Sequence, residues 1–127
     1  METKEKIVEQ YWKSFDECNF DLTETFIDPN VKVIWPNTQE IFKGRDNFIL
    51  TQKNYPGTWK IRIVKLISTD DLVLSVVKVT SIDNSQSFYA TSFFEFTGDY
   101  IIKITEYWGE ISEPPEWRIN GGWSERH

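Results

Sequence analysis

The sequence predicts an α+β fold in which helices come first and a sheet of long strands follows. The apolar residues of the first fifty positions recur with helical spacing, whereas those of residues 59–108 alternate with the period of two that strands require. The segments between the later strands are short turns, and connections this short join antiparallel neighbours. A helical half followed by a strand meander is an α+β pattern.

The first helix is expected over residues 3–18, with Thr3 as its N-cap. Its apolar side chains follow the spacing of one helical stripe: Ile7, Val8, Tyr11, Trp12, Phe15 and Cys18. Cys18 has no histidine beside it, so we expect a small buried apolar residue rather than a nucleophile.

The next segments are shorter. A second helix is expected over residues 22–27 behind a capping Asp21, and a turn at Asp28-Pro29-Asn30. A short strand over residues 31–35 and a hairpin partner near residues 40–42 follow. A third helix is then expected, at residues 45–55.

Four long strands are expected over residues 59–68, 72–82, 87–96 and 100–108. Both faces of this sheet are apolar, because Phe88, Phe94 and Phe96 alternate with Tyr89 and Phe93. One face can pack on the helices. The other needs a cover, so we predict a homodimer through the outer sheet face, helped by the tryptophan-bearing tail of residues 113–127.

Size and charge exclude several classes of function. A length of 127 residues favours a single domain spanning residues 1–127. The net charge of −6 argues against nucleic acid and anionic membranes as partners. No run of apolar residues predicts a membrane span or a secretory signal. The lone cysteine forms no internal disulfide, which favours the cytoplasm.

The most informative residue is Glu106, in the last long strand. Ile102, Ile104, Glu106 and Trp108 are spaced two apart, so they are expected to share one face. Burying a carboxylate unpaired among apolar neighbours is costly. Glu106 therefore lies either at a rim, paired with a lysine or arginine, or inside a polar pocket, and the residues alone leave both alternatives open.

A resemblance to a known family rests on five segments taken in order: Glu9–Trp12, Trp35–Asn37, Phe42–Phe48, Ile104–Gly109 and Pro115–Arg118. In this combination the chain resembles the nuclear transport factor 2-like superfamily, specifically its SnoaL-like, polyketide-cyclase-like branch. The resemblance implies a cone-shaped, curved antiparallel sheet wrapped around three helices, with a central cavity. Such proteins include ketosteroid isomerase, scytalone dehydratase, limonene epoxide hydrolase and non-catalytic carriers, so the fold implies no single activity.

An isomerase-like alignment can be carried over residue by residue. The tyrosine that donates a hydrogen bond to the substrate oxygen falls on Tyr11. The aspartate base falls on Trp35, which cannot accept a proton, although the following proline is kept as Pro36. The protonated aspartic acid of the oxyanion hole falls on Ser92, a weaker donor. The resemblance therefore argues against ketosteroid isomerase chemistry by the usual residues.

The same resemblance places Ile104, Glu106 and Trp108 on the cavity wall. It implies catalytic roles for Glu106, Tyr11 and Ser92, and substrate-binding roles for Trp12, Phe15, Trp35, Phe94, Ile104 and Trp108. Each has a structural alternative: Tyr11 could be a core tyrosine, Ser92 a satisfied strand hydroxyl, and the tryptophans packed core rings.

No cofactor or metal is expected. His127 is the only histidine and the last residue, so histidine triads and zinc sites are disfavoured. The acidic pairs Asp16-Glu17 and Asp70-Asp71 lie at a helix end and a turn, where such residues are ordinarily solvated.

Three hypotheses follow. The first is a cofactor-independent enzyme that uses acid/base chemistry on an apolar cyclic carbonyl compound, as a cyclase, dehydratase or isomerase would. The second is a non-catalytic carrier that binds an apolar small molecule in the same aromatic cavity. The third is a dimerisation module whose cavity is filled by its own rings.

Overall fold

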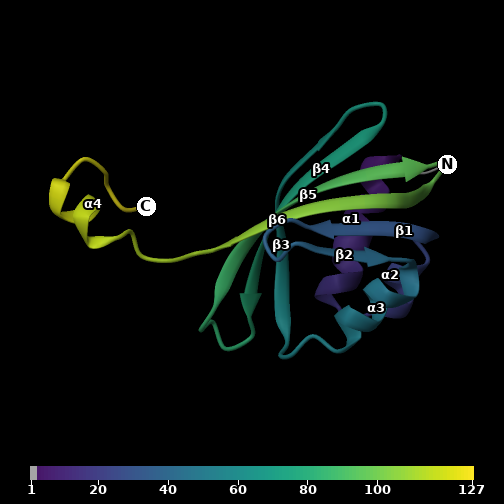
Figure 1. Ribbon diagram of the computed structural model, residues 1–127, viewed down its shortest axis with the longest axis horizontal. Helices are drawn as coiled ribbons and strands as arrows, with labels where there is room; N and C mark the ends of the chain where they lie inside the picture. The colour runs from purple at the N-terminus through teal and green to yellow at the C-terminus, as the bar shows by residue number, and fades with distance from the viewer. Residues whose placement is uncertain (1–2) are drawn as a thin grey trace.

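The computed structural model describes residues 3–127, so Met1 and Glu2, the start of the predicted 1–127 domain, lie outside it. Its elements are α1 (Lys4–Asp16), α2 (Phe20–Glu24), β1 (Ile27–Trp35), β2 (Glu40–Lys43), α3 (Arg45–Lys53), β3 (Trp59–Ser68), β4 (Leu72–Ser81), β5 (Ser87–Thr97), β6 (Tyr100–Glu110) and α4 (Glu116–Gly121). Figure 1 shows α1, α2 and α3 gathered beside a curved sheet. The predicted α+β fold class is confirmed. No helix within residues 3–127 has the length and apolar character needed to cross a membrane.

Helix α1 begins as predicted and ends early. The Thr3 side chain accepts a hydrogen bond from the Lys6 amide at 3.1 Å, as an N-cap does. At the other end the Asn19 amide donates to the Ser14 carbonyl at 2.8 Å, which closes the helix. Cys18 lies in this reversal, with a φ of 53° and an exposed side chain. The expectation that Cys18 is a buried member of the helical stripe is therefore wrong.

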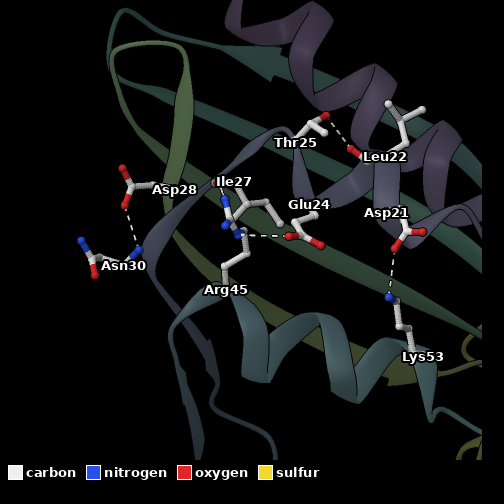
Figure 2. A network of polar contacts seen from close by, with 9 residues as sticks. All are labelled: Asp21, Leu22, Glu24, Thr25, Ile27, Asp28, Asn30, Arg45 and Lys53. Atoms are coloured by element: carbon white, nitrogen blue, oxygen red, sulfur yellow. Dashed lines mark hydrogen bonds and ion pairs between the residues drawn. The ribbon is translucent and has the colours of Figure 1, made fainter.

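The connection from α2 to β1 also differs from expectation. Asn19, not Asp21, caps α2, because its side chain accepts from the Leu22 amide. The predicted turn at residues 28–30 lies inside β1, which already begins at Ile27. Asp28 Oδ1 accepts the Asn30 amide at 2.8 Å (Figure 2), and the pairing of β1 with β6 shifts register there. The local hydrogen bond forms as in a turn, and β1 pairs with β6 on either side of it, at Ile27 and Lys32, so the turn is an irregularity within the strand.

Within residues 3–127 the six strands form one sheet in the order β2-β1-β6-β5-β4-β3. The four long strands pair antiparallel, as the short turns predicted, whereas β1 pairs with β6 in parallel. Helix α1 covers the edge strand β3, where Asp16 Oδ1 accepts the Ile61 amide at 2.8 Å. An edge satisfied in this way is protected from pairing with other chains.

The inner face of the sheet carries the core. Ile104 and Phe94 are fully buried and paired across β6 and β5. A register shift between Glu95 and Phe96 turns Ile101 inward in place of Ile102, so the prediction that Ile102 shares the inner face is wrong. A second shift, between Ile63 and Lys65, interrupts the alternation in β3.

Candidate functional site

A cavity of about 470 Å³ lies between the helices and the inner face of the sheet. This size is typical of small-molecule sites. Half of the lining residues are aromatic: Tyr11, Trp12, Phe15, Phe20, Trp35, Phe48, Tyr55, Trp59, Phe88 and Trp108. The cavity is open in this structure, so its own rings do not fill it.

The rings form a continuous band along the wall. Trp35 and Trp108 have ring centroids 6.5 Å apart, Trp108 and Phe88 6.2 Å, and Phe88 and Trp59 5.7 Å. The loop after Trp35 is fixed to β6, because Asn37 Oδ1 accepts the Trp108 amide at 3.1 Å. Such a band offers flat apolar surfaces to a cyclic ligand.

The cavity has a polar side, where Asp21 of α2 and Gln52 and Lys53 of α3 line it. Lys53 Nζ donates to Asp21 Oδ1 at 2.9 Å, and this hydrogen bond raises the pKa of Lys53 (Figure 2). Arg45 lies 3.8 Å from Glu24 and donates to the Ile27 carbonyl at 3.2 Å, which ties α3 to α2 and to the start of β1. These contacts hold the two short helices in place beside the cavity.

A row of four side chains crosses the inner face at the bottom of the cavity, and we call it the cavity row: Ser75, Ser92, Glu106 and Trp35. The strand register places Ser75 opposite Ser92 and Ser92 opposite Glu106. Trp35 follows Ile34, which pairs with Thr105, so Trp35 lies beside Glu106. Ser92 Oγ donates to Glu106 Oε2 at 2.5 Å. Behind this contact Trp12 Nε1 donates to Ser75 Oγ at 2.9 Å.

Glu106 is partly buried and lines the cavity. Burial raises the pKa of its carboxyl, and the hydrogen bond from Ser92 and the nearby Trp35 N–H lower it only in part. Within residues 3–127, no lysine or arginine forms an ion pair with this carboxylate. The alternative of a rim carboxylate paired with a cation is therefore not what the structure shows.

Two hydrogen-bond donors face the same region. Tyr11 lines the cavity, and burial together with the charge of Glu106 raises its pKa well above the ordinary value, so the phenol keeps its proton. Trp35 Nε1 is buried and makes no hydrogen bond of normal geometry with any of residues 3–127. A buried donor without a partner is costly, so a ligand acceptor at this position would be favoured. A carboxyl that exchanges protons beside two neutral donors is suited to acid/base chemistry on a carbonyl compound.

The structure brings together most of the predicted site residues. Six of them line the cavity: Glu106, Tyr11, Trp12, Phe15, Trp35 and Trp108. Ser92, Phe94 and Ile104 are fully buried behind the wall. Ser92 still reaches Glu106, whereas Phe94 packs on the Tyr11 ring at 5.2 Å and supports it from below. The catalytic and binding roles of all nine residues stay predictions.

Sequence reasoning missed several lining residues. Trp59, Ile61 and Val79 alternate along strands whose register places them on the inner face, whereas the family resemblance had already placed Phe88 and Ala90 inward. Parity along each predicted strand could have identified the first three. Tyr55, Gln52 and Lys53 come from the end of α3, and the sequence carries no signal that this end reaches the cavity. Among residues 3–127, no three His, Cys, Asp or Glu side chains are grouped so as to hold a metal ion.

Comparisons with known proteins identify relatives only by structure. Neither the protein-family models nor the curated protein sequences contain a match. A candidate ketosteroid isomerase from Kribbella flavida superposes with a TM-score of 0.85 at 20% identity, over 98% of this chain and 89% of that one. An NTF2-like protein of unknown function from Burkholderia xenovorans gives 0.82 at 19%, over 98% and 94%. An LEH-like epoxide hydrolase from M. tuberculosis gives 0.72 at 14%, over 84% and 82%.

These likenesses establish the fold. The chain has the nuclear transport factor 2-like fold, as the sequence resemblance predicted. Identities of 20% or less do not transfer an activity, so function must be argued from the cavity itself.

Proposed function

We propose that this protein binds an apolar cyclic carbonyl compound in the aromatic cavity and moves a proton on it with Glu106. The chemistry is that of a cyclase, dehydratase or isomerase without a cofactor, and we assign the chain to the SnoaL-like branch on this basis. The observation that carries the proposal is the cavity row, in which a carboxyl with a raised pKa lies beside a buried indole N–H that makes no hydrogen bond of normal geometry.

The proposed step is a proton transfer. With the ligand ring against Trp35 and Trp108, its carbonyl oxygen accepts a hydrogen bond from the neutral Tyr11 phenol. The Glu106 carboxylate removes a proton from the adjacent carbon, and the electron pair of that C–H bond moves onto the carbonyl oxygen as an enolate. The proton on Glu106 is returned to the product at another carbon, or to a leaving hydroxyl, so no outside reductant or oxidant is needed.

Residue positions favour this arrangement. Ser92 holds one carboxylate oxygen at 2.5 Å, which fixes the rotamer of Glu106 and leaves the second oxygen for the ligand. The raised pKa brings the carboxyl nearer to neutral pH, where a general acid/base is most effective. The raised pKa of Tyr11 keeps it a donor throughout.

Hydrogen–deuterium exchange tests the proposal without knowledge of the product. Steroid-like and polyketide-like cyclic ketones are first screened by tryptophan fluorescence, and those that bind are incubated with enzyme in D2O. Deuterium incorporation beside the carbonyl is followed by NMR. We expect Glu106→Gln to bind equally well and to lose exchange by about 10²–10⁴-fold. The matched control Glu95→Gln, on the outer face of the same sheet, should leave exchange unchanged.

A specific observation favours a second candidate, a non-catalytic carrier. Trp35 and Ser92 stand where the isomerase resemblance expects two carboxyl groups. Both of those carboxyl groups are therefore missing, and Glu106, at a different position, is the one carboxyl proposed to act in their place. Binding of a ketone with no deuterium incorporation in the wild-type protein would establish the carrier and sink the enzyme. Absence of binding across the panel would sink both.

We also propose a homodimer through the outer sheet face. In register across the strands, a mostly apolar row runs over that face: Ile41, Ile34, Thr105, Phe93, Leu74 and Ile67. Ile41 and Ile67 are 56% and 52% exposed, so the row is open to a partner. Sedimentation should show a dimer at micromolar concentration, and Phe93→Lys should convert it to a 15 kDa monomer.

A cytoplasmic location remains part of the proposal, because the free thiol of Cys18 is exposed.

A further inference from the structure

The C-terminal arm, residues 111–127, projects from the end of β6 and leaves the body of the molecule (Figure 1). Its large apolar side chains face solvent: Trp117 is 65% exposed, Ile119 51% and Trp123 77%. The superpositions on the Kribbella and Burkholderia structures cover 98% of the chain and therefore extend into this arm. An arm with two solvent-facing tryptophans leaves a large apolar surface uncovered.

The arm has a defined shape of its own. The Trp123 ring lies over Gly121, where a Cβ atom would come within 2.3 Å of a ring carbon. Arg126 pairs with Glu113 and closes the arm into a hook around α4. An isolated helix of six residues is not stable in water. The hook therefore holds its tryptophans in a defined arrangement, but a helix this short needs to pack on another surface to be stable.

The outer sheet face offers a surface of opposite charge. Although the chain carries a net charge of −6, seven of its 14 cationic residues lie on this face: Lys32, Lys43, Lys60, Arg62, Lys65, Lys78 and Lys103. Lys32 stands directly between Lys43 and Lys103 on the neighbouring strands, and we call these three the lysine row. Like charges placed opposite one another destabilise a sheet, so an acidic partner would relieve this row. Glu95 reaches Lys103 at 3.7 Å.

The arm carries suitable acidic groups. Glu116 and Glu125 make no ion pair within residues 3–127. The arm cannot bring them to the lysine row of its own chain, because Lys103 and Glu110 are separated by the length of β6, about 23 Å, and the arm points away from that end (Figure 1). In a two-fold dimer with antiparallel β6 strands, the arm of each copy leaves toward the lysine-row end of the other.

We propose that the C-terminal arm of one copy packs on the outer sheet face of a second copy, and reciprocally. Trp117 and Trp123 cover the apolar row, and Glu116 and Glu125 approach Lys32 and Lys43. This inference rests on the proposed homodimer and adds the exchange of arms to it. The interface is isologous, so both arms are buried or neither is.

Charge reversal in full-length protein tests the exchange. One variant reverses the face (Lys32→Glu with Lys43→Glu) and another reverses the arm (Glu116→Lys with Glu125→Lys). We expect each variant alone to dimerise at least tenfold more weakly than wild type in sedimentation equilibrium. An equimolar mixture should recover wild-type affinity, because each arm then meets a face of opposite charge. Arms that fold back on their own chain would give no recovery on mixing.

The controls separate this inference from the dimer itself. Glu9→Lys with Glu17→Lys makes the same change of charge on the exposed side of α1 and should leave the dimer unchanged. If Phe93→Lys breaks the dimer while both charge variants behave as wild type, the sheet contact is right and the arm exchange is wrong. A wild-type monomer would overturn both. Because the Trp117 and Trp123 side chains are 65% and 77% exposed in the single copy, Trp117→Ala with Trp123→Ala should weaken the dimer without altering thermal unfolding of the monomer.

Discussion

Two groups of buried polar side chains lie close together in this molecule and differ in kind. The first, the closed cluster, joins α1 to α2: Ser14 Oγ donates to the Tyr11 carbonyl at 2.6 Å and lies 2.5 Å from Thr23 Oγ1, which is 3.2 Å from the Asn19 carbonyl. The second is the cavity row. Every hydroxyl of the closed cluster has a partner, whereas the cavity row contains a carboxyl with a raised pKa and an indole N–H that lies near this carboxyl without a hydrogen bond of normal geometry.

This difference in hydrogen bonding distinguishes a group that stabilises the fold from a group suited to binding a ligand. Buried polar groups that satisfy one another stabilise a fold and offer nothing to a ligand. Groups left unsatisfied beside a cavity reduce stability in the free protein, and that cost can be recovered when a ligand supplies the missing partner. Changes in the closed cluster should therefore alter stability alone, and changes in the cavity row should alter ligand binding or proton transfer while stability stays equal or rises.

Glu106→Gln should show the largest effect on stability. Because burial raises the folded-state pKa of Glu106 above its unfolded-state value, the folded protein holds this proton more tightly. That contribution to stability is fully present below the unfolded-state pKa and is lost as pH rises through the folded-state pKa. Above that window the variant should be the more stable protein, by about 1.4 kcal/mol for each pH unit by which the pKa is raised.

Urea unfolding at a series of pH values from about 4 to 8 measures this difference. Glu9→Gln provides the control, because Glu9 is exposed on α1 and makes no ion pair within residues 3–127. Its difference from wild type should not grow with pH. A Glu106→Gln variant that is less stable than wild type at neutral pH would contradict the assignment of Glu106 to the unsatisfied group.

Thr23→Val should have a smaller effect and the opposite sign. Valine keeps the shape of the fully buried Thr23 and removes its hydroxyl, so the closed cluster loses hydrogen bonds worth about 1 kcal/mol net. Adding Ser14→Ala should cost less than the sum of the two single changes, since no partner is then left unpaired. Ligand affinity, read from tryptophan fluorescence, should stay at the wild-type value, and a loss of affinity would remove the distinction between the two groups.

The sequence could predict the cavity row only in part. Alternation along the last strand placed Glu106 on the same face as Ile104 and Trp108, and the structure has this arrangement. Alternation failed at Ile102 because register shifts in a sheet depend on the neighbouring strand and leave no local trace. The nearness of Trp35 to Glu106 depends on the parallel pairing of β1 with β6, which sequence spacing does not reveal.

The closed cluster had no sequence signal. Ser14 lies in the middle of α1 and Thr23 in α2, where single hydroxyl residues are ordinary, and only the angle between the helices brings them together. Cys18 was misplaced for a related reason. Its spacing continues the apolar stripe, but the hydrogen bonds that close α1 at Ser14 and Phe15 turn the chain before Cys18 can face the core.

A matched pair of tryptophans gives the finest test of the comparison, because it contrasts two side chains of the same type. Trp12 and Trp35 both line the cavity, but the Trp12 N–H is bonded to Ser75 at 2.9 Å, whereas the Trp35 N–H lies near Glu106 without a hydrogen bond of normal geometry. Trp12→Phe leaves a buried serine without its donor and should cost about 1–3 kcal/mol. Trp35→Phe removes a donor that makes no hydrogen bond of normal geometry, so its stability should stay closer to wild type than that of Trp12→Phe.

Ligand binding should rank the two variants in the opposite order: Trp35→Phe, the less costly change for stability, should lose more affinity for a ligand with an acceptor. If the Trp35 N–H is held in reserve for a ligand acceptor, Trp35→Phe should weaken binding of a cyclic ketone by about tenfold, the equivalent of one hydrogen bond. A saturated hydrocarbon of the same shape has no acceptor and should bind both proteins equally. Equal losses for ketone and hydrocarbon would mean that Trp35 contributes only its ring, and the cavity row would then hold one functional group, Glu106, rather than two.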